Sequence, residues 1–241
     1  MASAAATIDS PWAMDAGSVR SIALILHGGE ATSVKTAGRW RGPYLRMIPF
    51  AAALHRHGHK QGLSVRLLRY RYRGWNEPEL HPVADARWAL DHLGERHPDA
   101  PVVLLGHSMG GRTALRVADH PAVMAVCALA PWTPEDEPVH QLTGRPVLIA
   151  HGDRDRVTDP ALSYRFAVRA RAVSERVCRF EVAGDGHAML RRSRDWTALV
   201  TRFIEPALGL SEPEPLITDA MARPIPEGLR VPLPPRLSWP T

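Results

Sequence analysis

Three kinds of reactive side chain follow apolar runs in this sequence: a serine, a pair of carboxylates and a histidine. Ser108 stands in the motif Gly-His-Ser-Met-Gly at 106–110, Asp153 and Asp155 follow the run 145–150, and His187 follows the run 177–182. A serine hydroxyl is a weak nucleophile that needs a base to accept its proton, and the base needs an acid to orient it. The three groups therefore predict nucleophilic chemistry at Ser108 through a covalent intermediate.

The residues around Ser108 predict a strand, a sharp turn and a helix. The run 102–105 is apolar throughout, as in a buried parallel strand, and Ala114, Leu115 and Ala118 follow at helical spacing. Glycines two residues before and two residues after Ser108 leave room for a tight turn because they lack a Cβ atom. Such a turn lifts the hydroxyl above the sheet and directs the backbone N–H of Met109 toward the space beside it.

Apolar runs alternate with amphipathic segments along the chain and predict an α/β fold. Strands that alternate with helices form parallel sheets with right-handed crossovers. We expect a three-layer αβα sandwich around a mostly parallel sheet of about six strands. The expected strands are 21–26, 63–72, 102–105, 123–130, 145–150 and 177–182, and the expected helices are 44–57, 82–93, the segment after Ser108, 160–175 and 194–208.

On these residues, the chain from Ser21 to Leu210 resembles the α/β-hydrolase superfamily, and more narrowly the small, lidless bacterial hydrolases of dienelactone-hydrolase and carboxylesterase type. The resemblance implies the chain order serine, acid, histidine. It also implies that the acid is the third residue after Gly152, which selects Asp155 rather than Asp153 or Asp185. Asp153 and Asp159 are then expected to be turn or helix-capping residues.

The resemblance implies roles for further residues. His27-Gly28-Gly29 after the first strand is similar to an oxyanion loop, so the N–H groups of Gly29 and Met109 would hold the oxyanion. The alternative is a glycine turn with His27 packed as a structural side chain. The segment 133–144 is too short for the helical cap that many relatives carry, so the site should be open. Its expected substrate contacts are Trp132, Trp75 and His107.

The chain divides by composition into a lead-in at 1–20, a hydrolase domain at 21–210 and a Pro-rich tail at 211–241. Eight prolines after residue 211 argue against regular helix or central strand, so we expect an extended tail with Leu216, Ile217 and Trp239 as anchors. This tail is interpreted as a strap along the body or as a disordered segment. A ligand for a proline-recognising partner is the weaker alternative.

Composition argues against several classes of partner. The net charge of the 241 residues is +5, but the arginines are scattered and Lys35 and Lys60 are the only lysines, so no nucleic-acid partner is expected. The N-terminus lacks the pattern of a signal peptide, and the longest apolar stretch, 122–132, is too short to cross a bilayer. Cys127 and Cys178 fall on strands separated by another strand and cannot pair, which favours a reducing cytoplasm.

Two groups of basic residues allow more than one interpretation. Arg66, Arg69, Arg71 and Arg73 form the densest basic run, at the carboxyl end of a strand, where they could steer an anionic substrate. Solvated arginines paired with nearby acids are the alternative. His55, His57 and His59 are two residues apart and do not share one helix face, so we expect no metal site and no cofactor.

The sequence thus predicts a cofactor-free hydrolase of carboxylic esters of small molecules. A thioesterase, peptidase or acyltransferase would use the same three residues, as would a C–C hydrolase or a cofactor-free haloperoxidase. A non-catalytic binding protein on the same scaffold is the alternative from another class. The sequence leaves the physiological substrate and the oligomeric state open.

Overall fold

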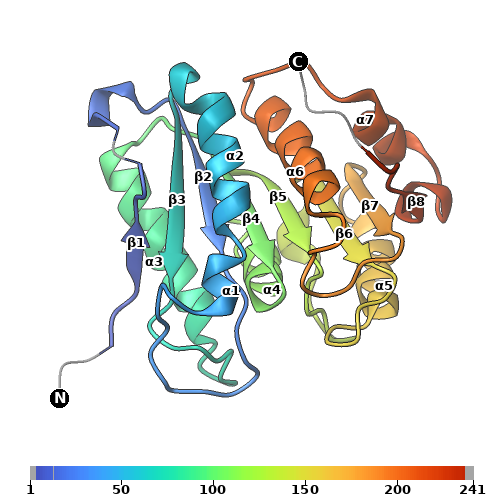
Figure 1. Cartoon of the computed structure of the whole chain (residues 1–241), viewed down its shortest axis with the longest axis horizontal. Helices are drawn as coiled ribbons and strands as arrows, with labels where there is room; N and C mark the ends of the chain where they lie inside the picture. The colour runs from blue at the N-terminus through green and yellow to red at the C-terminus, as the bar shows by residue number, and fades with distance from the viewer. Residues whose placement is uncertain (1–3, 13, 237–241) are drawn as a thin grey trace.

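The computed structural model describes residues 4–12 and 14–236, which form an eight-stranded sheet with helices on both faces (Figure 1). The strand order is β1-β3-β2-β4-β5-β6-β7-β8, and β1 runs antiparallel to β3 whereas the other neighbouring strands pair in parallel. The expected α/β architecture is confirmed, with two edge strands beyond the six expected. The strands are β1 Thr7–Asp9, β2 Ser21–Leu26, β3 Leu63–Arg69, β4 Val102–His107, β5 Val123–Leu129, β6 Val147–Gly152, β7 Val177–Val182 and β8 Val231–Pro232.

Helices cover both faces of the sheet (Figure 1). Helices α1, α2 and α6 lie in front of it and α3, α4 and α5 lie behind it in that view. The bounds are α1 Gly42–Leu45, α2 Ile48–Gly58, α3 His81–Arg96, α4 Met109–Arg116, α5 Pro160–Arg171, α6 Ser193–Ala207 and α7 Pro215–Ala222. The single helix expected at 44–57 is divided into α1 and α2, because Pro49 takes the first turn of α2, where its missing N–H costs nothing.

Two hydrophobic cores stabilise this arrangement, one on each face of the sheet. Along β2, Ile22 and Leu24 pack into the core under α3, α4 and α5, whereas Ala23 and Ile25 pack into the core under α2 and α6. Successive side chains of a strand point to opposite faces, so a strand that is covered on both faces is apolar throughout. Each large aliphatic side chain buried in this way contributes about 1.5–3 kcal/mol.

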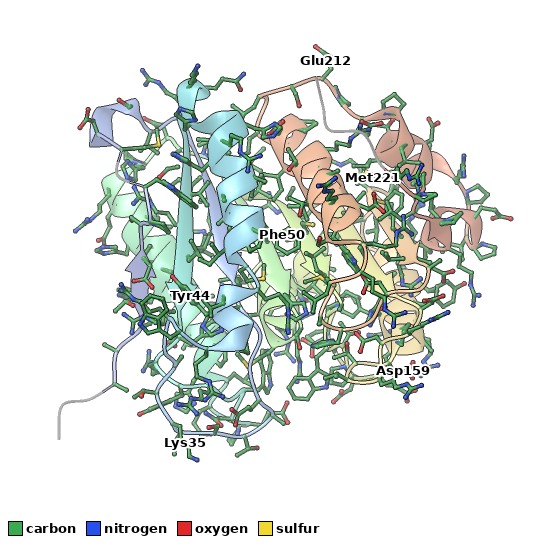
Figure 2. All side chains as sticks on the ribbon, viewed as in Figure 1. Lys35, Tyr44, Phe50, Asp159, Glu212 and Met221 are labelled. Carbon is green, nitrogen blue, oxygen red and sulfur yellow. The ribbon has the colours of Figure 1, made fainter. Side chains whose placement is uncertain are left out.

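The loops that follow the parallel strands gather at one end of the molecule. Figure 2 places Lys35 and Asp159 at this lower end, where the strand arrows of Figure 1 finish. Among the described residues, the connection between β5 and β6 holds one short 3₁₀ turn, His140–Leu142, and no cap covers this end. The absence of a cap agrees with the sequence prediction.

The C-terminal segment differs from the extended tail that its prolines predicted. Pro215 begins α7, where a proline is tolerated, and the next proline, Pro224, lies beyond the end of this helix. Val231 and Pro232 then add β8 to the edge of the sheet beside β7. Ile217 is buried and Leu216 packs against the same core, as anchors would, whereas Trp239 lies outside the described residues.

The structure also bears on the predictions about the lead-in, the two cysteines and membrane-spanning segments. The lead-in contributes β1, whose Ile8 pairs with Leu68 of β3. Cys127 and Cys178 are free and lie on β5 and β7 with β6 between them, as predicted. Within the part of the chain that the structure describes, every helix is too short or too polar to span a membrane.

Candidate active site

Ser108 occupies the turn between β4 and α4 in a strained backbone conformation. Its φ is 56° and its ψ is −120°, a region that residues with a Cβ atom rarely adopt. The turn depends on close approach of the chain on either side: a Cβ atom on Gly106 would lie 2.2 Å from the carbonyl oxygen of Gly110. The glycine spacing in the sequence is therefore required by the backbone, and the serine stands at the apex above the sheet.

The side chains of Ser108, His187 and Asp155 form a continuous hydrogen-bonded row. Ser108 Oγ lies 3.0 Å from His187 Nε2, and His187 Nδ1 lies 2.8 Å from Asp155 Oδ2. The three residues follow β4, β7 and β6 respectively, so their proximity results from the parallel sheet, whose strands end at the same edge. The geometry permits His187 to accept the serine proton while Asp155 holds the ring in orientation.

The carboxylate of Asp155 is buried and surrounded by donors. Oδ1 accepts hydrogen bonds from the backbone N–H groups of Val157 and Thr158, and Oδ2 accepts one from the Thr158 hydroxyl. Burial on its own would raise the pKa of Asp155. The hydrogen bonds from His151, His187 and the two N–H groups outweigh it and hold the pKa well below its usual range. Asp155 is therefore ionised at neutral pH.

The other carboxylates near this end are used in loops and caps. Asp153 accepts the N–H of Gly184 at 2.7 Å, and Asp159 caps α5 by accepting the N–H of Ala161. Asp185 accepts the N–H of Gly186 at 2.8 Å and lies within the loop that carries His187. The expected capping role of Asp159 is thus observed.

Gly29 and Met109 lie beside Ser108 and share a cavity of about 240 Å³ with it. Met109 is the first residue of α4, so its N–H has no acceptor within that helix. A Cβ atom on Gly29 would lie 2.3 Å from the carbonyl oxygen of Arg73, so only glycine allows this loop to approach so closely. The cavity continues past Trp132, Val157 and Thr158.

The three expected substrate contacts lie in different environments. Trp132 is half-buried and lines the cavity. Trp75 is only 1% exposed and does not line the cavity. The Arg112 guanidinium packs on it, 4.0 Å from its ring centre and 4.6 Å from that of Trp132. His107 is also buried, and its Nε2 donates to the carbonyl oxygen of His187 at 2.9 Å. His107 therefore supports the histidine loop from behind.

The basic run begins on β3 and continues past its end, and its members contact other parts of the chain: Arg66 donates to the hydroxyl of Ser10. Arg69 pairs with Asp9, and Arg71 pairs with the buried Asp85. Arg73 donates to the carbonyl oxygen of Thr36. These contacts favour the interpretation as paired arginines over the steering of an anionic substrate.

Two residues in contact with Asp155 were not singled out in the sequence. Thr158 Oγ lies 2.9 Å from Asp155 Oδ2 and 3.1 Å from His187 Nδ1, and His151 Nε2 lies 3.2 Å from the same carboxylate oxygen. The available signals were the polar His151 at the end of an apolar strand and a hydroxyl three residues after Asp155. No group of three or more His, Cys, Asp or Glu side chains within 4–12 and 14–236 is arranged to hold a metal ion.

Comparisons with known proteins agree with this fold. A family model described as "Alpha/beta hydrolase family" matches residues 23–237. No curated protein matches the sequence. Among solved structures, an esterase from Pyrococcus furiosus has a TM-score of 0.62 at 17% identity, over 81% of this chain and 84% of that one.

Two further solved structures are similar. A putative alpha/beta hydrolase from Agrobacterium tumefaciens has a TM-score of 0.62 at 19% identity, over 87% of this chain and 94% of that one. The protein Est1E from Butyrivibrio proteoclasticus, solved with ferulic acid bound, has a TM-score of 0.60 at 16% identity, over 85% of this chain and 95% of that one. At these identities the likeness shows the fold.

Proposed function

Because the chain belongs to the alpha/beta hydrolase family, we propose that it is a serine hydrolase that cleaves carboxylic esters of small molecules through an acyl-enzyme. The observation that carries this proposal is the row of hydrogen bonds from Ser108 through His187 to Asp155. A binding protein on the same scaffold would need neither the strained serine nor an ionised, buried carboxylate behind the histidine. Both are costly to maintain, which favours a catalytic role.

In the proposed reaction, Ser108 Oγ attacks the ester carbonyl carbon while His187 Nε2 takes its proton. The tetrahedral oxyanion is held by the N–H groups of Met109 and Gly29. His187 then returns the proton to the alkoxide oxygen, the C–O bond breaks and the alcohol leaves. Water enters and attacks the acyl carbon, with His187 again as base, and the acid is released as Ser108 recovers its proton.

The proposed substrates are esters with short acyl groups. The cavity beside Ser108 is about 240 Å³, and its walls include Val157, which is 72% exposed. Each acyl methylene that remains in water forgoes about 0.8 kcal/mol of burial. We therefore expect kcat/KM to be level or to fall as the acyl chain lengthens in a p-nitrophenyl ester series. A steady rise to long chains would contradict this part of the proposal.

Replacement of the nucleophile tests the function itself. Ser108→Ala should fold like the wild type, yet lose both labelling by a fluorophosphonate and turnover of p-nitrophenyl acetate. The matched control is Ser193→Ala at the start of α6, which should label and turn over normally. Undiminished turnover by a pure Ser108→Ala protein would refute the proposal.

A further inference from the structure

Asp155 contacts two histidines with one carboxylate oxygen. Oδ2 lies 2.8 Å from His187 Nδ1 and 3.2 Å from His151 Nε2. The two rings have different surroundings: His187 faces Ser108 and its side chain is 14% exposed, whereas the side chain of His151, in β6, is fully buried. The acid of the proposed reaction therefore has a second imidazole behind it that the reaction does not use.

The neighbours of His151 determine which of its nitrogens carries hydrogen. Nε2 lies 3.2 Å from Asp155 Oδ2 and 3.2 Å from the carbonyl oxygen of Thr158, and both of these atoms can only accept. Nε2, which also lies 3.3 Å from the Thr158 hydroxyl, therefore donates. In a neutral ring Nδ1 is then the acceptor, so the single hydrogen of the Ser163 hydroxyl goes to Nδ1 at 2.8 Å rather than to the carbonyl oxygen of Pro160 at 3.0 Å. This assignment gives a neutral imidazole whose N–H points at the carboxylate.

The row of donors extends further, to a buried arginine on β7. Arg179 Nε donates to Ser163 Oγ at 3.1 Å, and the same guanidinium also binds Glu181 and the carbonyl oxygens of Pro160 and Leu229. Arg179, Ser163 and His151 are each no more than 2% exposed. Donation therefore runs in one direction, from Arg179 through Ser163 and His151 to Oδ2 of Asp155, where it meets the donor His187 at the same oxygen.

The surroundings keep His151 uncharged. Burial lowers the pKa of His151, the carboxylate of Asp155 opposes this effect, and the positive charge of Arg179 adds to it. The other titratable groups around the pair are His187, His107 on β4, whose pKa burial also holds well below its ordinary value, and Glu181 beside Arg179. Of the two imidazoles on Asp155, only the one that faces Ser108 takes part in the proposed proton transfer.

We propose that His151 is a positioning residue for the hydrolytic reaction. As a neutral donor, it holds Oδ2 of Asp155 in line with His187. Its hydrogen bond also limits how strongly the carboxylate retains the His187 proton. The role rests on the proposed function, and it is exerted through Asp155, since His151 is not among the residues that line the cavity beside Ser108. Ser163 and Arg179 fix the tautomer that makes this donation possible.

Loss of the donor has two measurable effects. The carboxylate becomes freer to rotate, so kcat falls, while KM stays close to the wild-type value because the cavity is unchanged. The carboxylate also attracts the proton on His187 more strongly, so His187 becomes available as a base only at higher pH. The acid limb of the kcat/KM profile therefore moves toward higher pH.

The experiment compares His151→Leu with His151→Gln, whose side-chain N–H can take the place of Nε2–H. Active enzyme is counted by fluorophosphonate titration, and kcat, KM and the pH profile are measured with p-nitrophenyl acetate. His151→Leu should lose about ten- to a hundredfold in kcat and shift the acid limb upward by about half a pH unit or more. His151→Gln should recover most of both. The control is His120→Leu, which removes another His–Asp contact, with Asp91, away from this network and should leave the profile unchanged.

The outcomes separate the two proposals. A labelled His151→Leu enzyme with the wild-type kcat and acid limb, or a His151→Gln enzyme as impaired as His151→Leu, overturns the role of His151 alone. If His151→Leu does not fold, Ser163→Ala decides in its place, because it removes the donor to Nδ1: a raised acid limb supports the proposal and an unchanged one overturns it. A wild-type protein that neither labels nor hydrolyses esters overturns the proposed function and this role with it.

Discussion

The indole Nε1 of Trp196 donates a hydrogen bond of 3.0 Å to Oδ2 of Asp185. The same carboxylate accepts the N–H groups of Gly186 and Arg192, so it closes the loop that carries His187 and fastens this loop to α6. Although Asp185 is two residues from His187 in sequence, its oxygens are occupied within the loop. The residue that faces the ring is Asp155, from a different strand.

This difference predicts the ranking of three amide variants. Asp155→Asn should lose about four decades in kcat, because an amide cannot stabilise the protonated histidine or fix its tautomer. Asp153→Asn is the control, since its carboxylate accepts one loop N–H and does not touch His187. Asp185→Asn should lower the Tm while retaining more activity than Asp155→Asn. Steady-state kinetics and thermal melts check the ranking, and a more active Asp155→Asn than Asp153→Asn would refute it.

The buried ion pair in the connection between β5 and β6 should be important for stability. Glu137 is fully buried and contacts both Arg112 and Arg116 of α4. Without Glu137, the buried Arg112 keeps only the exposed Glu77 as an ion-pair partner. Removal of one partner of a buried pair costs about 3–5 kcal/mol. Glu137→Gln should therefore lower the free energy of unfolding by about this amount in a urea titration.

The same connection offers a matched control for Glu137. Glu135 pairs with Arg165 at 3.2 Å, but both side chains are more than half exposed. Exposed pairs contribute at most about 1 kcal/mol. Glu135→Gln should therefore stay within about 1 kcal/mol of the wild type, and equal losses in the two variants would contradict the importance of burial here.

Glu205 of α6 predicts a pH dependence of stability. Burial raises its pKa from 4.5 to about 7, and His57 Nδ1 lies 3.7 Å away. Between about pH 4.5 and 7 the folded protein keeps this proton while the unfolded chain releases it, so the free energy of unfolding falls as pH rises through this window. Burial also lowers the pKa of His57, so His57 contributes the opposite slope below its usual pKa, and the comparison with a Glu205 variant isolates the Glu205 contribution.

The variant Glu205→Gln should remove this dependence. Its Tm should exceed that of the wild type by more at pH 8 than at pH 4.5, because the cost of a buried charge is complete only above pH 7. The exposed Glu212→Gln serves as control and should show no such difference. A Tm gain that is the same at both pH values would contradict the shift.

The C-terminal segment should stabilise the fold without affecting catalysis. Leu229 is fully buried in the core behind the sheet, so Leu229→Ala should lose about 2–5 kcal/mol. Leu216→Ala, at a half-buried position, should lose less. Neither residue lines the cavity beside Ser108, so kcat of the folded enzyme should be unchanged. A large fall in kcat with normal stability would show that this segment shapes the site.

The parts of the fold and site that the sequence predicted are those encoded by neighbouring residues. The turn at Ser108 is specified by a few consecutive positions, because its glycines and its apolar strand are adjacent. The meeting of Ser108, Asp155 and His187 was expected from the resemblance to the α/β-hydrolases, and it is explained by parallel strands that end at one edge.

The features that the sequence did not predict depend on distant partners. Trp75 was expected to contact substrate, but it is 1% exposed and packs against Arg112, from the helix after the serine. His151 acquires its neighbours Ser163 and Arg179 only when α5 and β7 pack beside β6. The helix α7 was missed because the proline content of the tail outweighed the proline-free stretch after Pro215.

The short strand β8 has a consequence for how copies of this chain meet. A bare outer strand offers unpaired backbone groups to any other chain, which leads to edge-to-edge aggregation. Here Val231 and Pro232 pair with Phe180 and Glu181, and the proline presents no N–H outward. At the opposite border, β1 is only three residues long. A proline-rich segment at the edge of a parallel sheet can thus protect that edge from pairing with other chains. Loss of residues 211–236 should leave β7 as an exposed edge strand that pairs with other copies of the chain.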